Sequence, residues 1–226
     1  MIRKPNFKLN WKYTLGELAL IFLGISLAIA FQNWNEQKKV RVLEREILTE
    51  IQESLSLDSL ELTEIRDAFL LADKAAEKIL KSKSSTPEKD SISVWLGQFI
   101  NFERFNPASS PYEVLKSVGL QTISNRELRS MMAEYYDEAV PNIIEALYDV
   151  EEDFEKNAYN LLLEKFKDFK FKSYAIPKDV NVLLNDPSVI MYLKIFRDNR
   201  SGAMAHFENA LSLSDQVSSM IRKKLN

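Results

Sequence analysis

The apolar stretch Leu15-Gly-Glu-Leu-Ala-Leu-Ile-Phe-Leu-Gly-Ile-Ser-Leu-Ala-Ile-Ala-Phe31 dominates the N-terminal part of this 226-residue chain. A helix over residues 13–31, rising about 1.5 Å per residue, reaches roughly 28 Å, which is close to the hydrocarbon thickness of a bilayer. The stretch therefore predicts a transmembrane helix over residues 13–31. A short basic tail over residues 1–12 precedes it.

Aromatic residues flank the predicted span on both sides. Trp11 and Tyr13 come at its start, and Trp34 follows its end. Amphipathic rings of this kind favour the boundary between lipid and water. We expect these three side chains to anchor the helix at the two membrane interfaces.

A cleaved secretory signal is the alternative interpretation of the same stretch. Basic residues precede it, residues 18–27 form an apolar region, and Ala28-Ile-Ala30 has the small-x-small pattern of a cleavage site. However, the apolar period continues through Phe31 into Asn33-Trp-Asn35 without a turn residue. This continuity favours a retained membrane anchor.

One face of the predicted span is small and partly polar. On a helix, positions 17, 21, 24, 28 and 32 share a face, and they carry Glu17, Ile21, Gly24, Ala28 and Gln32. Small residues four apart let membrane helices approach closely. We expect this face to pack against a second copy or another membrane protein. Alternatively, Glu17 lies within a turn of the boundary and reaches the lipid head groups.

Charge is distributed unevenly along the chain. Up to Arg41 there are seven basic and two acidic residues, whereas residues 42–226 hold 23 basic and 31 acidic ones. Basic residues around the span suit anionic membrane lipid, and the acidic remainder argues against nucleic acid as a partner. Four basic residues precede the span and four closely follow it, so the N-terminal amine decides the orientation. We expect an inner-membrane protein with a cytoplasmic N-terminus and a periplasmic C-terminal domain.

Two segments resemble a known family. The run from Tyr13-Thr-Leu-Gly-Glu-Leu18 through Leu23–Ala30 to Asn33-Trp-Asn-Glu36 is similar to the N-terminus of an uncharacterised family of single-span membrane proteins common in the Bacteroidota. Pro111–Leu120 with Asn125-Arg-Glu-Leu128 resembles the central segment of that family. The resemblance implies a membrane anchor and carries no assigned activity.

The rest of the chain predicts long helices. Only five Gly and seven Pro occur, while 46% of residues are hydrophobic and 28% are charged, and such a composition favours helices over a many-stranded sheet. Apolar residues recur at 40, 43, 47, 51 and 55, then at 62, 65, 69, 72, 76 and 79, with a stutter near Asp58. Long helices are therefore predicted at about 32–81, 125–168 and 187–225, and short ones at 91–100 and 111–118.

Turn and capping residues set the boundaries of these helices. Ser82–Pro87 predicts the first break, and Gly119 the end of a short helix. Ser110-Pro-Tyr-Glu113 and Ser124-Asn-Arg-Glu127 have the pattern of capping boxes, with each Ser as N-cap. Asn185-Asp-Pro187 is expected to start the last helix.

Two further local features give structural expectations. Pro141 should bend the helix that contains it, because it lacks a backbone N–H. The alternation in Phe169-Lys-Phe-Lys-Ser-Tyr174 predicts a short strand that pairs with residues 102–105. The same aromatic–basic pattern also occurs in surfaces for single-stranded nucleic acid, which the acidic surroundings disfavour.

Residues that carry common enzyme chemistry are scarce. There is no Cys, and His206 is the only histidine, so di-iron helical bundles and His-rich zinc sites are excluded. The acidic residues Asp149, Glu151, Glu152, Asp153 and Glu155 lack the spacing of a calcium-binding loop. No Gly-rich phosphate loop is present. We therefore expect no catalytic residues, cofactor or metal, and no enzyme.

The sequence predicts an all-α protein, with an N-terminal transmembrane helix followed by an elongated antiparallel helical bundle over residues 32–226 with coiled-coil-like helices. Two functions remain open. The first is a membrane-anchored interaction or scaffold protein, a subunit or accessory of an envelope complex. The second is a ligand-sensing extracytoplasmic bundle that acts through a partner.

Overall fold

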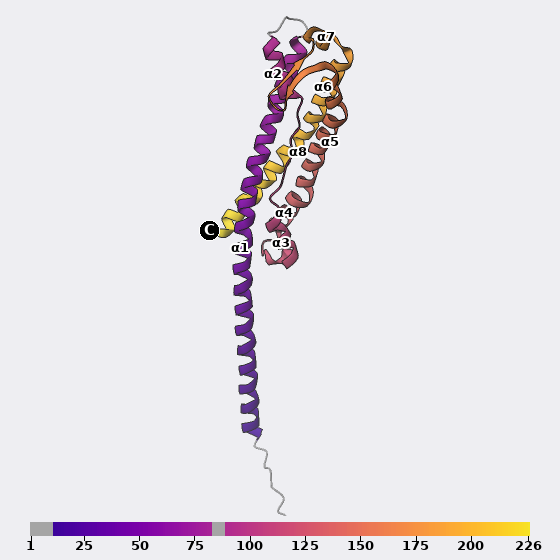
Figure 1. The fold of residues 1–226 in the computed structure, drawn as a ribbon. Coiled ribbons are helices and arrows are strands. Elements are labelled where there is room, and N and C mark those ends of the chain that lie inside the picture. Colours follow the sequence, from indigo (N-terminus) through magenta and orange to yellow (C-terminus); the bar gives the residue numbers. More distant parts are fainter. Residues whose placement is uncertain (1–10, 83–88) are drawn as a thin grey trace, which may run out of the picture. The chain divides into compact units, whose positions relative to one another are not determined.

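The computed structural model describes residues 11–82 and 89–226, which are mostly helical. The predicted N-terminal tail up to Asn10 and most of the predicted break at Ser82–Pro87 lie outside the described residues. Contacts divide the chain into two units, Met1–Glu46 and Ile47–Asn226. Figure 1 shows the helices and the single hairpin.

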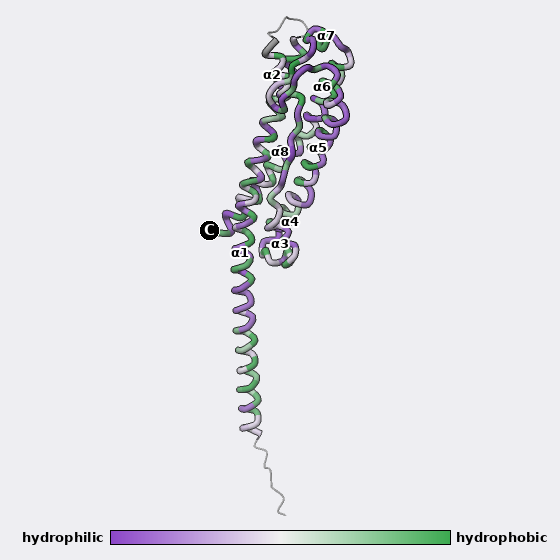
Figure 2. Tube along the Cα trace, in the orientation of Figure 1, coloured by the Kyte–Doolittle hydropathy of each residue, from purple (hydrophilic) through white to green (hydrophobic). Residues whose placement is uncertain are grey.

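Helix α1 spans Trp11–Lys81 without interruption. In the first unit, the part of α1 that carries the apolar stretch is exposed along its length, and Figure 2 shows it as a hydrophobic band. In the second unit, α1 buries the side chains at 47, 51, 55, 62, 65, 69, 72, 76 and 79, as the sequence predicts. The prediction was wrong at Val40 and Leu43, which are 47% and 36% exposed. The buried apolar seam therefore starts at Ile47, seven residues after the first expected position.

The second unit continues with short helices. They are α2 (Lys89–Phe99), α3 (Ser110–Val118) and the 3₁₀ turn η2 (Leu120–Thr122). Gly119 ends α3, as predicted, with a φ of 100° that favours glycine.

Both predicted capping boxes were placed one residue from the real caps. The N-cap of α3 is Ser109, and its side chain makes no capping hydrogen bond. The next helix, α4 (Arg126–Ala133), is capped by Asn125, whose Oδ1 accepts a hydrogen bond from the Leu128 N–H at 3.1 Å. The short Asn side chain serves this role as well as Ser does, which is why the sequence pattern did not distinguish the two.

The helical run from Arg126 to Lys165 contains two π-helical segments. Its parts are α4, η3 (Glu134–Ala139), α5 (Val140–Asp153), η4 (Phe154–Ala158) and α6 (Tyr159–Lys165). The π segment η3 ends at Ala139, two residues before Pro141, and the Val140 N–H bonds the Tyr135 carbonyl. The bend expected at Pro141 stays a prediction.

After α6 the chain forms a hairpin. Strand β1 (Phe166–Lys170) pairs antiparallel with β2 (Tyr174–Pro177), with an irregularity between Phe166 and Asp168. The predicted single strand over residues 169–174 was wrong, because residues 171–173 form the turn and only the ends of that segment lie in β1 and β2. The predicted pairing with residues 102–105 was also wrong. Strand β1 instead pairs with the segment that follows the turn, since a hairpin needs only a short turn.

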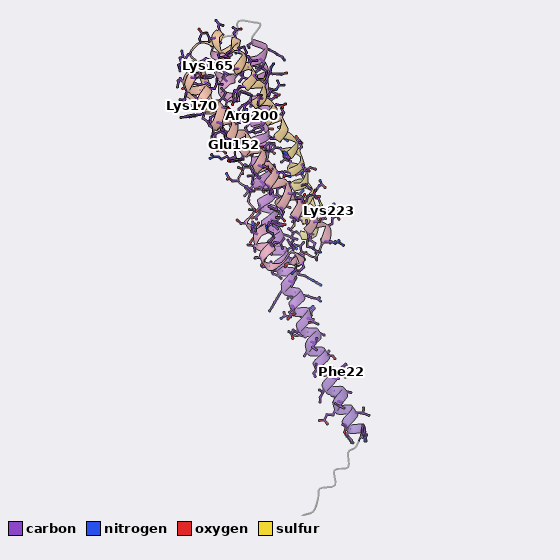
Figure 3. All side chains as sticks on the ribbon, turned by 90° about the vertical axis from the view of Figure 1, so that its right-hand side faces the viewer. Phe22, Glu152, Lys165, Lys170, Arg200 and Lys223 are labelled. Atoms are coloured by element: carbon purple, nitrogen blue, oxygen red, sulfur yellow. The ribbon has the colours of Figure 1, made fainter. Side chains whose placement is uncertain are left out.

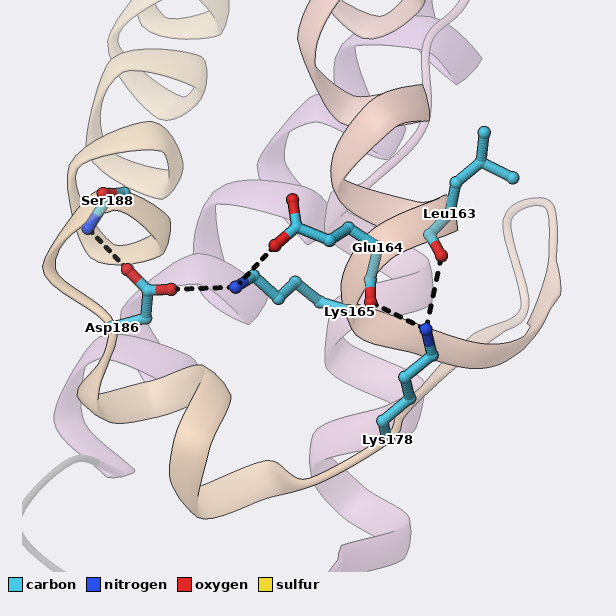
Figure 4. A network of polar contacts seen from close by, with 6 residues as sticks. All are labelled: Leu163, Glu164, Lys165, Lys178, Asp186 and Ser188. Carbon is cyan, nitrogen blue, oxygen red and sulfur yellow. Dashed lines mark hydrogen bonds and ion pairs between the residues drawn. The ribbon is translucent and has the colours of Figure 1, made fainter.

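Two helices close the chain. They are α7 (Val180–Asn185), which the sequence did not predict, and α8 (Pro187–Leu225), with the bounds expected for the last helix. Asp186 caps α8 through the Ser188 N–H at 2.9 Å and also contacts the Lys165 ammonium at 3.3 Å (Figure 4). The hydrogen bond from the Ser188 N–H and the nearby Lys165 ammonium lower the pKa of Asp186.

Helix α8 contacts α4, α5 and α7, and several of its side chains meet α1. Ser214 hydrogen-bonds Ser59 at 2.7 Å, Phe207 packs edge-on against Phe69 with centroids 5.5 Å apart, and Arg197 lies 3.4 Å from Asp73. Together these helices enclose one hydrophobic core in the second unit.

Candidate functional site

The predicted packing face of the span lies on the exposed part of α1. Glu17, Gly24, Ala28 and Gln32 are all exposed. A Cβ added at Gly24 would meet no atom within 4 Å. The Gln32 amide donates to Glu36 at 3.2 Å. Within the described residues, this face is open to a partner.

The predicted interface anchors are equally accessible. Trp11, Tyr13 and Trp34 are 70%, 79% and 60% exposed. Trp34 also contacts Phe31, with ring centroids 5.8 Å apart. In addition, an 18-residue window of α1 near the N-terminus has a mean hydropathy of 2.1 and no buried residue. The structure thus contains one helix that is long and apolar enough to cross a membrane.

A second site lies in the second unit, where the hairpin meets α6. A hollow of about 530 Å³ is lined mainly by apolar side chains from Phe102, η4, α6 and the hairpin. Its size falls within the range of about 300–1,000 Å³ that is usual for small-molecule sites. Sequence analysis did not predict this hollow.

Aromatic rings form the inner wall of the hollow. The centroid of Phe102 lies 5.1 Å from that of Phe154 and 5.2 Å from that of Phe171, and Phe154 lies 6.0 Å from Phe171. Tyr159 and Leu163, one turn apart on α6, add an outer edge that is 54% and 65% exposed. Apolar area therefore remains uncovered here.

The π segment η4 contributes to this wall. It contains Phe154 and is followed directly by Tyr159, so the widened turn lies at the hollow. Within η4 there is no proline to account for the irregularity. Single π turns inside α-helices often mark functional sites.

Four consecutive residues after α2 each contact a different part of the second unit. Asn101 accepts hydrogen bonds from Arg200 on α8, and Phe102 lines the hollow. Glu103 pairs with Lys172 of the hairpin at 2.6 Å, and Arg104 holds Glu151 on α5 with two Nε contacts of 3.1 and 3.0 Å. This Asn101–Arg104 segment therefore fixes one wall of the hollow.

The turn of the hairpin is held by tertiary contacts. Lys172 has a φ of 58°, a backbone conformation that is unfavourable for residues other than glycine. Its ion pair with Glu103 and its position 5.6 Å from the Phe171 ring stabilise this conformation. The turn directs Phe171 into the aromatic wall.

Basic side chains lie at the edge of the hollow. Lys167 lines it, and Lys170 follows on the same strand (Figure 3). Neither lysine makes an ion pair within the part of the chain that the structure describes. Asp168 also lines the hollow, but its carboxylate accepts bonds from the Phe169 N–H at 2.9 Å and the Tyr174 hydroxyl at 3.1 Å. These two donors are uncharged, so Asp168 keeps its negative charge, and the two lysines outnumber it at this edge.

Lys178, which directly follows β2, bonds the C-terminal end of α6 (Figure 4). Its ammonium donates to the Glu164 carbonyl at 2.8 Å and the Leu163 carbonyl at 3.5 Å, and its backbone N–H donates to the Lys165 carbonyl at 2.8 Å. The last carbonyls of a helix have no partner within the helix. Lys178 satisfies three of them.

Arg200 is a buried cation without a carboxylate partner among the described residues. It is 3% exposed, and its guanidinium lies 4.6 Å from the Phe196 centroid and 5.3 Å from those of Phe69 and Phe99. Burial lowers its pKa to about 10. Its burial could have been predicted, because position 200 falls on the apolar face of α8, between Phe196 and Ala203.

A second buried polar group lies at the predicted stutter of α1. Asp58 is 1% exposed and accepts hydrogen bonds from the Tyr135 hydroxyl at 2.9 Å and the Ala108 N–H at 2.7 Å. Burial raises the pKa of Asp58. Tyr136 stacks on Tyr112 beside it, with centroids 4.5 Å apart. These contacts join α1, α3 and η3 in the core.

The acidic residues of α5 and η4 are mostly engaged with neighbours. Glu151 pairs with Arg104, Glu152 with Lys156 at 2.7 Å, and Asp153 accepts from Asn157. His206 is exposed and lines a polar groove with Asp149 and Asp153. Among residues 11–82 and 89–226, no group of three or more His, Asp or Glu side chains is placed to hold a metal ion.

Comparison of the chain with models of known protein families, with curated proteins and with solved structures finds no match. The two features of the chain that bear on its function are the exposed apolar part of α1 and the aromatic hollow.

Proposed function

We propose that this protein is a single-span inner-membrane protein whose C-terminal domain serves as a periplasmic interaction or scaffold domain. The observation that carries the proposal is the apolar window of α1, of which no residue is buried. Leaving so many large apolar side chains in water is unfavourable by about 25 cal/mol for each Å². A bilayer removes that cost. Membership in the Bacteroidota family is part of the same proposal.

The proposed domain is an antiparallel helical bundle. Three pairs of contacts between α1 and α8 support this arrangement, because residue numbers rise along one helix as they fall along the other. The pairs are Ser59 with Ser214, Phe69 with Phe207, and Asp73 with Arg197.

Alkaline extraction of cell envelopes tests the membrane proposal. The full chain should remain in the membrane pellet, and the N-terminus of the mature protein should precede residue 13. A mature protein that begins at Phe31, or that is released by alkali, would show that the stretch is a cleaved signal. A protease added to intact spheroplasts should degrade the C-terminal domain if that domain is periplasmic.

The proposed partner is a second copy or another membrane protein that contacts the face of Glu17, Gly24, Ala28 and Gln32. Single cysteines at positions 17, 24 and 28 should crosslink within the membrane more efficiently than cysteines at 18, 22 and 29. All six positions are exposed, so the comparison is matched. Equal efficiency on both faces would refute the packing face.

A ligand-sensing bundle is the second candidate function. The aromatic hollow favours it, since a scaffold has no need for an open apolar pocket of about 530 Å³. In this role, a ligand bound in the hollow would change the surface of the domain that the partner contacts. Purification of the full chain in mild detergent distinguishes the two functions, because a stoichiometric protein supports the first and a bound small molecule the second.

A further inference from the structure

The hollow between α6 and the hairpin combines an apolar interior with a cationic edge. Phe102, Phe154 and Phe171 form its interior, and Leu163 and Tyr159 extend the apolar surface outward. Lys167 and Asp168 are the charged groups on its lining, and Lys170 adds a second positive charge on the same strand. A molecule that offers apolar surface and a negative charge close to each other therefore suits this site.

We infer that the hollow binds an anionic amphiphile, a molecule with an apolar chain or ring and a single acidic head group such as a carboxylate or phosphate. The chain would lie against the aromatic wall. The head group would contact Lys167, with Lys170 adding positive potential from the same strand. This inference deepens the ligand-sensing function and does not depend on the scaffold role.

Charge favours an anion over the other classes of apolar ligand. A cationic amphiphile would face the two positive charges of Lys167 and Lys170 against the single negative charge of Asp168. A neutral apolar ligand would gain nothing from Lys167, which is exposed to water. An anion supplies a partner for Lys167, and such a pair at an exposed edge typically contributes up to about 1 kcal/mol.

The walls of the hollow are held in place before any ligand binds. The Asn101–Arg104 segment fixes Phe102 on one side through Arg200 and Glu151. The pair of Glu103 with Lys172 fixes the turn that carries Phe171 on the other. A preformed site avoids much of the ordering cost of binding.

Photolabelling of the full chain in nanodiscs tests the inference. One probe is dodecanoate that carries a diazirine, and the other is phosphatidylglycerol with a diazirine on its acyl chain. Labelled peptides are mapped by mass spectrometry. We expect label within residues 154–171, reduced by excess dodecanoate and much less by dodecanol.

The two probes distinguish the source of the ligand. Label at 154–171 from dodecanoate alone supports a free amphiphile, and label from phosphatidylglycerol supports a membrane lipid. No label at 154–171 from either probe would overturn the inference. Both probes should also label residues 13–31 if that segment is in the bilayer. Failure at 13–31 contradicts the membrane anchor without affecting the result for the hollow.

Two substitutions test the role of each part of the site. Lys167→Gln should lower labelling by dodecanoate about fivefold, the effect of losing one exposed ion pair, whereas the control Lys223→Gln, on the exposed end of α8, should not. Leu163→Glu should abolish labelling, whereas Leu60→Glu, with a similar exposed fraction of 60%, should not. Circular dichroism establishes that each variant is folded. Unchanged labelling of folded Lys167→Gln and Leu163→Glu would refute the site.

Discussion

Gly97 is the position where a single methyl group should have the largest effect on the second unit. A Cβ at this residue would lie 2.3 Å from both the backbone N and the Cα of Tyr174, and 2.6 Å from the Ser173 carbonyl carbon. These are backbone atoms, which a rotamer change cannot move away. The glycine thus allows β2 to pack directly on α2.

The expected effect of Gly97→Ala is the difference between two opposing terms. Overpacking against backbone costs about 3 kcal/mol, the upper part of the usual range. Alanine regains about 1 kcal/mol through its higher helix propensity. We therefore expect the free energy of unfolding to fall by about 2 kcal/mol. For a domain of this size, that lowers Tm by about 4–8 °C.

Gly202→Ala is the matched control. Gly202 lies in the interior of α8, and a Cβ there would meet nothing within 4 Å. This variant should gain the helix propensity alone and be up to about 1 kcal/mol more stable. Thermal unfolding of the full chain in detergent, followed by circular dichroism, measures both. If Gly97→Ala is as stable as Gly202→Ala, the close packing of α2 on β2 is refuted.

Four further predictions concern the buried polar groups of the core. Asp58→Ala should lower the free energy of unfolding by about 2–4 kcal/mol, because the Tyr135 hydroxyl and the Ala108 N–H lose their acceptor; urea denaturation measures this, and a loss below about 0.5 kcal/mol would contradict it. Because burial raises the pKa of Asp58, its protonation stabilises the native state below pH of about 4 and this stability is lost as the pH rises. The advantage of the parent over Asp58→Asn should therefore shrink from pH 4 upward, and a growing advantage would contradict the assigned direction. Tyr135→Phe should cost about 1 kcal/mol through its lost hydrogen bond, whereas Tyr136→Phe, whose hydroxyl has no hydrogen-bond partner among the described residues, should be neutral or stabilising; the reverse order of stability would contradict these contacts. Burial also raises the pKa of both tyrosines, so stability should be full below pH of about 10 and fall above it, with their ionisation at 295 nm coinciding with unfolding.

Helix periodicity predicted most of the fold because burial in this chain follows the helical repeat closely. The seam of α1 from Ile47 to Ile79 and the face of α8 are examples. In contrast, Val40 and Leu43 continue the apolar spacing but stay exposed, since periodicity does not tell where the neighbouring helices end.

Local hydrogen-bonding choices were harder to predict. Ser109, Ser110, Ser124 and Asn125 are all acceptable caps, and tertiary packing decides which residue begins each helix. The alternation at residues 169–174 indicated extended structure, but it revealed neither the turn at 171–173 nor the strand partner, because a hairpin and a single strand can share one alternating pattern and many extended segments can pair with one edge.

The aromatic hollow could not be predicted from the sequence. Its wall combines Phe102, Phe154 and Phe171, which lie up to 69 positions apart in the numbering of the chain. No local spacing relates them. The packing face at Glu17, Gly24, Ala28 and Gln32 is the opposite case, since one helical repeat defines it, and it stays a prediction until a partner is found.

The Asn101–Arg104 segment has a consequence for how the domain responds to force or to an occupant. Each neighbour of Phe102 is tied elsewhere, to Arg200 in the core, Lys172 at the hairpin turn or Glu151 on α5. Planar peptide units join these residues, and only two dihedrals turn at each one. Displacing the Phe102 backbone would therefore strain all three attachments together, so a molecule that enters the hollow meets a wall that is braced from three sides.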